Sequence, residues 1–175
     1  MRSDLFCVPD NDPQKRYLLG QSGDKLLLAI ALNPSTANSS RLDPSSKNIQ
    51  AIARQQGCNG WVLANLCPLR STNPKKLPRK LSFQLMQENL AHISALLTST
   101  KTIKVLLCWG NGIESRDYLQ AAAKAICERI TEHQHHFYCL GYTSRHHPFH
   151  PSPQVLNKVF GGVQNTALKE FKFQE

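Results

Sequence analysis

The segment HHPFHPSP, residues 146–153, carries three histidines and three prolines near the end of the chain. Histidine can donate or accept a proton near neutral pH, so it suits acid–base chemistry and the stabilisation of a developing charge. Prolines reduce the conformational entropy that a loop loses on ordering. We therefore expect a stiff loop that holds a histidine, above all His150, in one place. The alternative is a rigid connector whose histidines cap helices or face water.

Four short apolar runs precede the polar segments of the chain. They are almost continuously hydrophobic, as strands buried on both faces of a sheet are. Helical patterns separate them, beginning near Asp43, Ser82 and Glu114. Alternating strands and helices predict a three-layer α/β sandwich around a four-stranded parallel sheet in the order 2-1-3-4. The predicted strands are KLLLAIAL (25–32), GWVLANL (60–66), IKVLLCWG (103–110) and HFYCLG (136–141).

The remaining segments fit one α/β domain over residues 1–175. The composition of YLLGQSGDK, before the first parallel strand, is typical of a hairpin arm. Residues 1–15 are then an N-terminal extension, and residues 154–175 are expected to close the domain with a helix interrupted at Gly161 and Gly162.

Parallel sheets bind ligands beyond the carboxyl ends of their strands. The first two predicted strands lead into Asn33 and Asn65, and the last leads into the histidine segment. We expect substrate-binding residues at this edge, namely Pro34, Ser35, Thr36, Asn65, Arg70 and Ser152. Other roles are open: Asn33 can form a turn before Pro34, and Arg70 can clamp a phosphate or pair with Asp43.

The charge balance favours an anionic partner. The chain has 21 Lys and Arg against 12 Asp and Glu, a net charge of +9. An excess of this size suits a nucleic acid or nucleotide partner, although a run of lysines is often only a solvated face. The candidate contacts to nucleic acid are Lys75, Lys76, Arg79, Lys80 and Arg145.

The cysteines and histidines do not predict a metal or a cofactor. The six cysteines contain no C-x-x-C pair, which indicates buried thiols in a reducing compartment. The run His133, His135 and His136 matches no zinc spacing, and Cys67 is a conceivable nucleophile with no histidine placed beside it. The longest apolar run, LLLAIAL, is too short to span a bilayer, so we expect a cytoplasmic protein.

Several motifs carry a resemblance to known proteins. LNPSTA followed by DPS, then NLCPLRSTNP, CWG and HPFHP resemble an uncharacterised family of small bacterial and phage proteins with the hallmark L-N-P-S-T-A-D. The resemblance runs from about Tyr17 to Pro153. The chain has Asn38 where that family usually has Asp, which questions any role of that carboxylate.

A more distant resemblance bears on activity. The ordered motifs ALNPS, LANLCPL, CWG and HPSP are similar to those of the uracil-DNA glycosylase superfamily. The resemblance implies that Asn33 positions the attacking water and Asn65 reads the edge of a flipped base. It also implies that His150 stabilises the negative charge on the departing base. The loop after Asn33 has no aromatic residue to stack a base, and no bulky wedge follows His150.

Two hypotheses follow. The first is a glycosylase-like enzyme that acts on a base or nucleotide by N-glycosidic hydrolysis or a related step. The second is a non-catalytic module that binds nucleic acid or a nucleotide, and a small-molecule hydrolase is a further alternative. The enzyme requires Asn33, Asn65 and His150 to converge on one pocket, whereas the binding module requires only a basic face.

Overall fold

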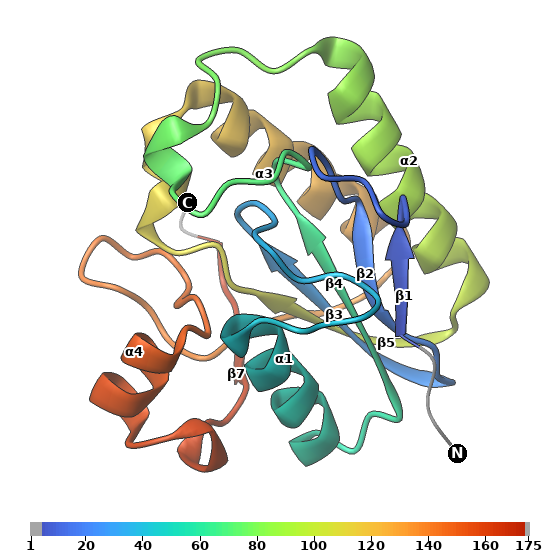
Figure 1. Cartoon of the computed structure of the whole chain (residues 1–175). Helices are drawn as coiled ribbons and strands as arrows, with labels where there is room; N and C mark the ends of the chain where they lie inside the picture. The colour runs from blue at the N-terminus through green and yellow to red at the C-terminus, as the bar shows by residue number, and fades with distance from the viewer. Residues whose placement is uncertain (1–4, 174–175) are drawn as a thin grey trace.

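A computed structural model describes residues 5–173 of the chain. Its centre is a seven-stranded sheet in the order β1-β2-β4-β3-β5-β6-β7 (Figure 1). The strands are β1 (Leu5–Val8), β2 (Leu18–Gln21), β3 (Lys25–Ala31), β4 (Gly60–Asn65), β5 (Thr102–Leu107), β6 (Phe137–Cys139) and β7 (Lys169–Glu170).

The four predicted strands are β3, β4, β5 and β6. They pair in parallel in the order β4-β3-β5-β6, which confirms the predicted order 2-1-3-4. The prediction of a four-stranded sheet was wrong, because three antiparallel strands extend it: β1 and β2 beside β4, and β7 beside β6. These edge strands have four, four and two residues, too few for a periodic hydrophobic signal.

Three helices cover the two faces of the sheet. They are α1 (Pro44–Gln55), α2 (Phe83–Ser99) and α3 (Asp117–Glu132). Side chains alternate along β3, so Leu27 packs on the face of α1 and Leu28 on the face of α2 and α3. Asp43 caps the start of α1 and accepts from the Ser46 amide, and Ser82 caps the start of α2 and accepts from the Leu85 amide. The mixed α/β architecture with layered helices is therefore present.

The N-terminal arm crosses to β4 rather than pairing with its sequence neighbour β3. The crossing is close at Gly20, where a Cβ atom would lie 2.2 Å from the main-chain oxygen of Trp61. Only glycine fits there. The expected extension over residues 1–15 contains β1, and its first four residues lie outside the described range.

The C-terminal segment differs from the single closing helix expected over residues 154–175. It forms α4 (Pro153–Val155), a π-helical turn η3 (Leu156–Phe160) and a 3-10 turn η4 (Val163–Asn165) before β7. Gly161 and Gly162 have φ values of 72° and 129°, which end the helix and turn the chain back to the sheet.

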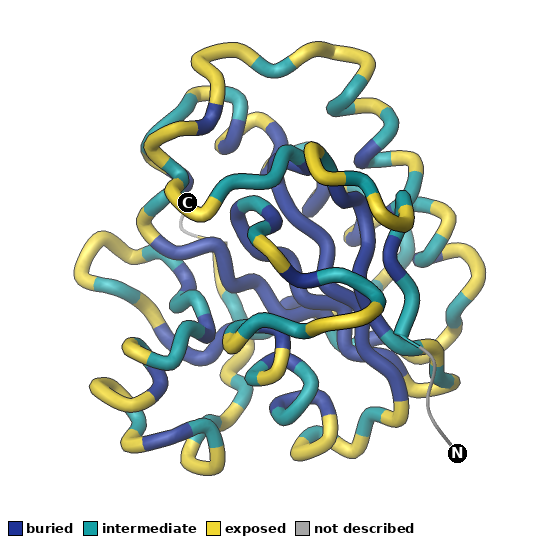
Figure 2. The backbone as a smooth tube through the Cα atoms, in the orientation of Figure 1, coloured by how far each residue is buried: buried dark blue, intermediate teal, exposed yellow. Residues whose placement is uncertain are grey.

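Burial separates the core of the sheet from its loops. The central strands are buried, while several loops around them are partly or fully exposed (Figure 2). All six cysteines are unbridged, and Cys58 alone among them is not buried. None of the helices in residues 5–173 has the length and apolar character needed to cross a bilayer.

Candidate functional site

A cavity of about 590 Å³ lies where β3, β4 and β5 end. The predicted site residues that line it are Asn33, Ser35, Thr36, Asn65, His150 and Ser152. Pro34, between Asn33 and Ser35 in the loop after β3, is buried. Arg70 lines an adjoining hollow of about 510 Å³, and Ser35 and Thr36 line both this hollow and the cavity. The sheet thus brings together three residues, Asn33, Asn65 and His150, that are far apart in the sequence.

Asn33 is fixed by the loop that follows β4. Its Nδ2 donates to the carbonyl oxygens of Pro34, at 3.0 Å, and Ser71, at 2.9 Å. The Ser71 amide in turn donates to the Pro34 carbonyl at 2.9 Å. Both side-chain N–H groups of Asn33 are therefore used by the backbone, as a turn former requires, and its Oδ1 is the atom it can offer to a ligand.

Arg16 is a residue of the cavity that sequence reasoning missed. It lies just before β2 and is 1% exposed, with Nη1 2.9 Å from the Ala37 oxygen and Nη2 3.4 Å from Asn65 Oδ1. Burial lowers the pKa of Arg16 to about 10, and the neighbouring Arg70 adds to this effect. Nothing local in QKRYLL marks Arg16, because the pairing of β2 with the distant β4 carries it to the cavity.

Arg70 holds the loop beside the cavity. Its guanidinium donates to the main-chain oxygens of Asp12, at 3.0 Å, Ser35, at 2.7 Å, and Ala37, at 3.0 Å. The alternative of a surface pair with Asp43 is therefore wrong. Arg70 shapes the loop that contains Ser35 and Thr36, and its charge lies close to that of Arg16.

His150 reaches the cavity on a loop tied to three elements. The Gly110 amide donates to the Pro148 oxygen at 2.9 Å, the Phe149 amide to the Gly141 oxygen at 3.0 Å, and Asn48 Nδ2 to the Pro151 oxygen at 2.9 Å. These bonds join the loop to the ends of β5 and β6 and to α1. The histidine segment is thus anchored, as a positioned side chain requires.

The surroundings of the His150 ring favour its neutral form. Burial lowers the pKa of His150, and the nearby carboxylate of Asp43 opposes this effect only in part. No hydrogen bond joins its ring to another residue within the described range 5–173. A neutral imidazole can donate one N–H to a ligand and accept one bond.

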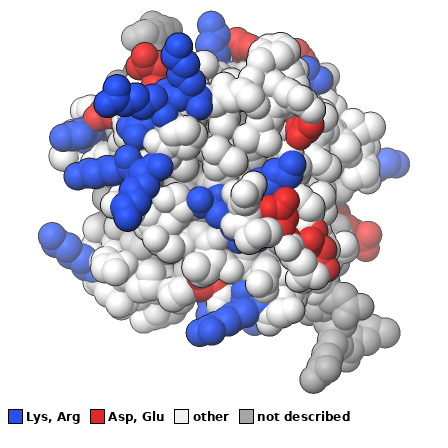
Figure 3. Space-filling model, turned by 45° about the horizontal axis from the view of Figure 1, so that its top comes forward, with Lys and Arg blue, Asp and Glu red and all other residues white. Residues whose placement is uncertain are grey.

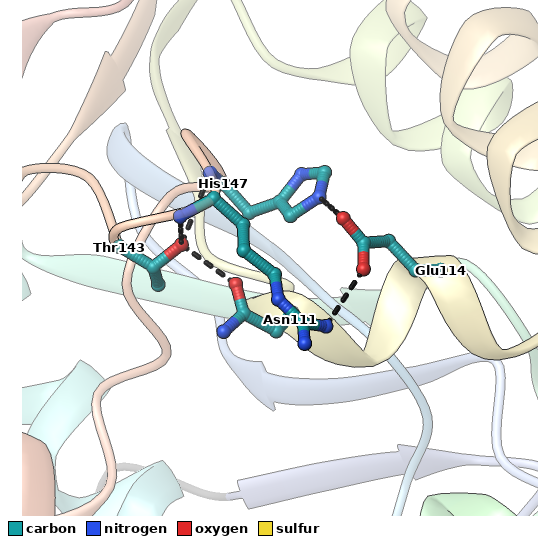
Figure 4. Close-up of polar contacts among 5 residues, drawn as sticks. Asn111, Glu114, Thr143 and His147 are labelled. Atoms are coloured by element: carbon teal, nitrogen blue, oxygen red, sulfur yellow. Dashed lines mark hydrogen bonds and ion pairs between the residues drawn. The ribbon is translucent and has the colours of Figure 1, made fainter.

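A polar clamp supports the start of the same loop (Figure 4). Glu114, on the 3-10 turn η2 (Asn111–Ser115), binds Arg145 Nη1 and His147 Nε2, each at 2.8 Å. The hydrogen bond from His147 lowers the pKa of Glu114. The Thr143 hydroxyl donates to Asn111 Oδ1 at 2.6 Å. Arg145, predicted to bind nucleic acid, is therefore engaged in an ion pair.

Asp43 is a second residue whose place in the cavity was not predicted. Its Oδ1 accepts from the Ser46 amide at 2.9 Å and from the Ser46 hydroxyl at 2.6 Å, so it caps α1. The same side chain lines the cavity and influences both His150 and Arg16 through its charge. The cap position was recognisable from DPSS, but its closeness to His150 arises from tertiary packing.

Asn38 has a local structural role. Its Oδ1 accepts from the Ser40 and Arg41 amides, each at 2.9 Å, and the residue lines the outer hollow beside Arg70 rather than the cavity. A carboxylate oxygen accepts the same two bonds. The departure from the L-N-P-S-T-A-D hallmark therefore preserves this turn.

The basic run begins at the rim of the cavity. Pro74 lines the cavity and opens the 3-10 turn η1 (Pro74–Lys76). Arg116 fixes this segment by donating to the Lys75 and Leu77 carbonyls at 2.9 and 2.8 Å. Figure 3 shows lysine and arginine side chains gathered on part of the surface. The predicted contacts Lys75, Lys76, Arg79 and Lys80 are all exposed.

Three other candidates from the sequence were a Cys67 nucleophile, a metal site and Trp109. Cys67 is fully buried, and burial raises the pKa of its thiol, which opposes a nucleophilic role. Within residues 5–173 no group of three His, Cys, Asp or Glu side chains is placed to hold a metal ion. Trp109 is core and cavity wall at once, being 7% exposed and in contact with the cavity.

The range matched by a known family coincides with this site. A family model described as a protein of unknown function (DUF1643) matches residues 16–152. The chain belongs to this family. The match begins at Arg16 and ends at Ser152, so it includes all the polar cavity residues discussed above. No curated protein and no solved structure matches the chain.

Proposed function

We propose that the protein is an enzyme that binds a base or nucleotide in this cavity and hydrolyses its N-glycosidic bond. The observation that carries the proposal is the convergence of Asn33, Asn65 and His150 on one cavity. Its volume of about 590 Å³ falls within the usual range for small-molecule sites, roughly 300–1,000 Å³.

The order of the sequence motifs also supports an N-glycosidic hydrolase. ALNPS, LANLCPL, CWG and HPSP occur in the order found in the uracil-DNA glycosylase superfamily. In the fold they end β3, β4 and β5 and begin α4, and each borders the cavity. A glycosylase-like fold is thus part of the proposal, and the chemistry must be argued from the side chains themselves.

The side chains suit the charges of the reaction. As the C–N bond breaks, its electron pair stays on the base, and the neutral imidazole of His150 can donate an N–H to the resulting anion. Asn65 lines the cavity, and in the proposal its Nδ2 donates to the edge of the base, while Oδ1 of Asn33 accepts a hydrogen bond from the attacking water. The oxygen of that water bonds to the sugar carbon, and its proton passes to the Asp43 carboxylate.

Base release from a panel of substrates tests this proposal. The panel contains single- and double-stranded oligonucleotides with uracil, hydroxymethyluracil or other modified bases, and free nucleosides. His150→Ala should reduce turnover by about 10²–10³, the usual effect of losing one donor to a developing anion. His147→Ala is the matched control, because His147 shares the loop but binds Glu114 outside the cavity. An activity that His150→Ala leaves unchanged contradicts the proposal.

A binding module without catalysis is the second candidate. The use of both Asn33 N–H groups by main-chain oxygens favours it, because the residue then has a complete structural role without substrate. A binding module of this kind binds oligonucleotides, but no substrate in the panel releases its base, whatever the effect of His150→Ala on the binding. Detection of a released base excludes this candidate.

A further inference from the structure

Three buried N–H donors on the cavity residues have no hydrogen-bond partner within the described part of the chain. They are Nε of Arg16, Nδ2 of Asn65 and Nε1 of Trp109. These side chains are 1%, 1% and 7% exposed. They come from the segment before β2, the end of β4 and the segment after β5, so three separate parts of the fold each supply the cavity wall with a residue whose donor is unused.

The orientation of the Asn65 amide follows from Arg16. A guanidinium has no acceptor, so the atom of Asn65 that faces Arg16 Nη2 at 3.4 Å must be Oδ1. Nδ2 is then the remaining end of the amide and is a donor. All three unused groups are therefore donors, and a ligand that satisfies them must present acceptors.

The local charge strengthens this requirement. No carboxylate in residues 5–173 forms an ion pair with Arg16. The charge of Asp43 favours the charged guanidinium from beyond ion-pair distance, but the neighbouring Arg70 disfavours it more strongly. Asp43, the acidic residue on the cavity wall, has its Oδ1 bonded to Ser46 at the start of α1. A buried arginine without a counter-ion favours an anion over a neutral acceptor.

We propose that Arg16, Asn65 and Trp109 form a subsite for an anionic oxygen group, a phosphate or a carboxylate, carried by the ligand of the cavity. Nδ2 of Asn65 carries two N–H groups, so one can bind the edge of the base and the other the anionic group. This inference rests on the proposed function for the identity of the rest of the ligand. It narrows the group that enters the cavity to one that carries an anionic oxygen, such as a nucleotide, over the corresponding neutral nucleoside.

Calorimetric binding at low ionic strength tests the subsite with four probes: uridine, uridine 5′-monophosphate, inorganic phosphate and acetate. The monophosphate should bind at least about tenfold more tightly than uridine, because a hydrogen bond to a charged group is among the stronger ones. Inorganic phosphate and acetate compete with it, and the tighter competitor identifies phosphate or carboxylate as the preferred group.

Two variants and two matched controls locate the binding. Asn65→Asp gives Arg16 a counter-ion and removes a donor, and Trp109→Phe removes Nε1 while keeping an aromatic ring. Each should weaken binding of the monophosphate by about tenfold or more without weakening uridine equally. Trp61→Phe is the control for Trp109, since Trp61 Nε1 is also buried and unpartnered but lies away from the cavity. Arg129→Gln is the control for Asn65→Asp, because both substitutions lower the net charge by one, and both controls should bind normally.

Equal affinity for uridine and its monophosphate overturns the subsite, as does equal weakening by Trp61→Phe and Trp109→Phe. Both outcomes are expected if the three donors bind only water molecules and not an anionic ligand. The two proposals fail separately. Base release from neutral nucleosides without any anion binding refutes the subsite and leaves the proposed function standing. Anion binding that Asn65→Asp and Trp109→Phe weaken, with no base release from any substrate, supports the subsite and refutes the enzyme.

Discussion

At the scale of single residues, the buried position of His150 determines its protonation state. Its pKa lies below the ordinary value of 6.5 because burial disfavours the imidazolium. The ring is therefore already a neutral donor at pH 7. In the proposed reaction, stabilisation of a departing anion by His150 then needs no protonation step, so turnover at pH 7 should not require acidification.

The same shift predicts a pH-dependent stability. Below about pH 6.5 the unfolded chain gains a proton at His150 before the folded chain does, so the folded state loses relative stability until the pH reaches the lowered folded pKa. Thermal unfolding of the wild type and His150→Gln between pH 8 and 5 measures this effect. The wild type should lose stability relative to the variant as the pH falls below 6.5. A constant difference across that window contradicts the predicted environment of His150.

The cavity residues that could be predicted from the sequence and those that could not are brought to the cavity by different interactions. Asn33, Asn65 and His150 follow predicted strands or lie in a marked motif, so the rule for parallel sheets located them. Arg16 lies in an arm whose pairing with β4 has no local signal. Asp43 was recognisable as a cap, but its presence beside His150 depends on how α1 meets the loop at Pro151.

At the scale of elements, the sequence determines the parallel core better than the edges. Runs such as that of β3, with six of seven residues buried, identify strands covered on both faces. Helices α1 and α2 begin one residue after their predicted starts at Asp43 and Ser82. Helix α3 begins at Asp117, three residues after the predicted Glu114, because Glu114 lies in the 3-10 turn η2. The two-residue β7 is formed by pairing with β6, so only the tertiary structure defines it.

Helix α1 allows the two roles of Asp43 to be separated. Asn caps helices about as well as Asp, whereas Ala at this position costs about 1 kcal/mol. Asp43→Asn should therefore preserve the free energy of unfolding, and Asp43→Ala should lower it by about that amount. Both variants should lose base release, because neither can accept the proton of the water. Denaturant unfolding and turnover, measured side by side, check this. Full activity in Asp43→Asn would limit Asp43 to capping.

At the scale of the whole molecule, the net charge of +9 can help an anionic ligand to reach the cavity only if basic side chains lie near it. The segment that leaves the cavity rim at Pro74 carries Lys75, Lys76, Arg79 and Lys80 on exposed positions. A strand of nucleic acid contacting this segment would have its phosphates beside the cavity entrance. In the proposed function, the basic run would thus extend the cavity as a contact surface for nucleic acid.

This arrangement predicts a steep salt dependence for oligonucleotide binding. Each phosphate contact on a single strand adds roughly 0.7 to the slope of log affinity against log salt, so four contacts contribute about 3. Replacing Lys75, Lys76, Arg79 and Lys80 with Gln should flatten the slope by up to that amount, measured by fluorescence anisotropy over a salt series. The control replaces four exposed lysines elsewhere, Lys25, Lys101, Lys124 and Lys169, and removes the same charge. If both quadruple variants change the slope equally, only the overall charge attracts the nucleic acid, because counterion release at a defined surface depends on which phosphates the protein contacts.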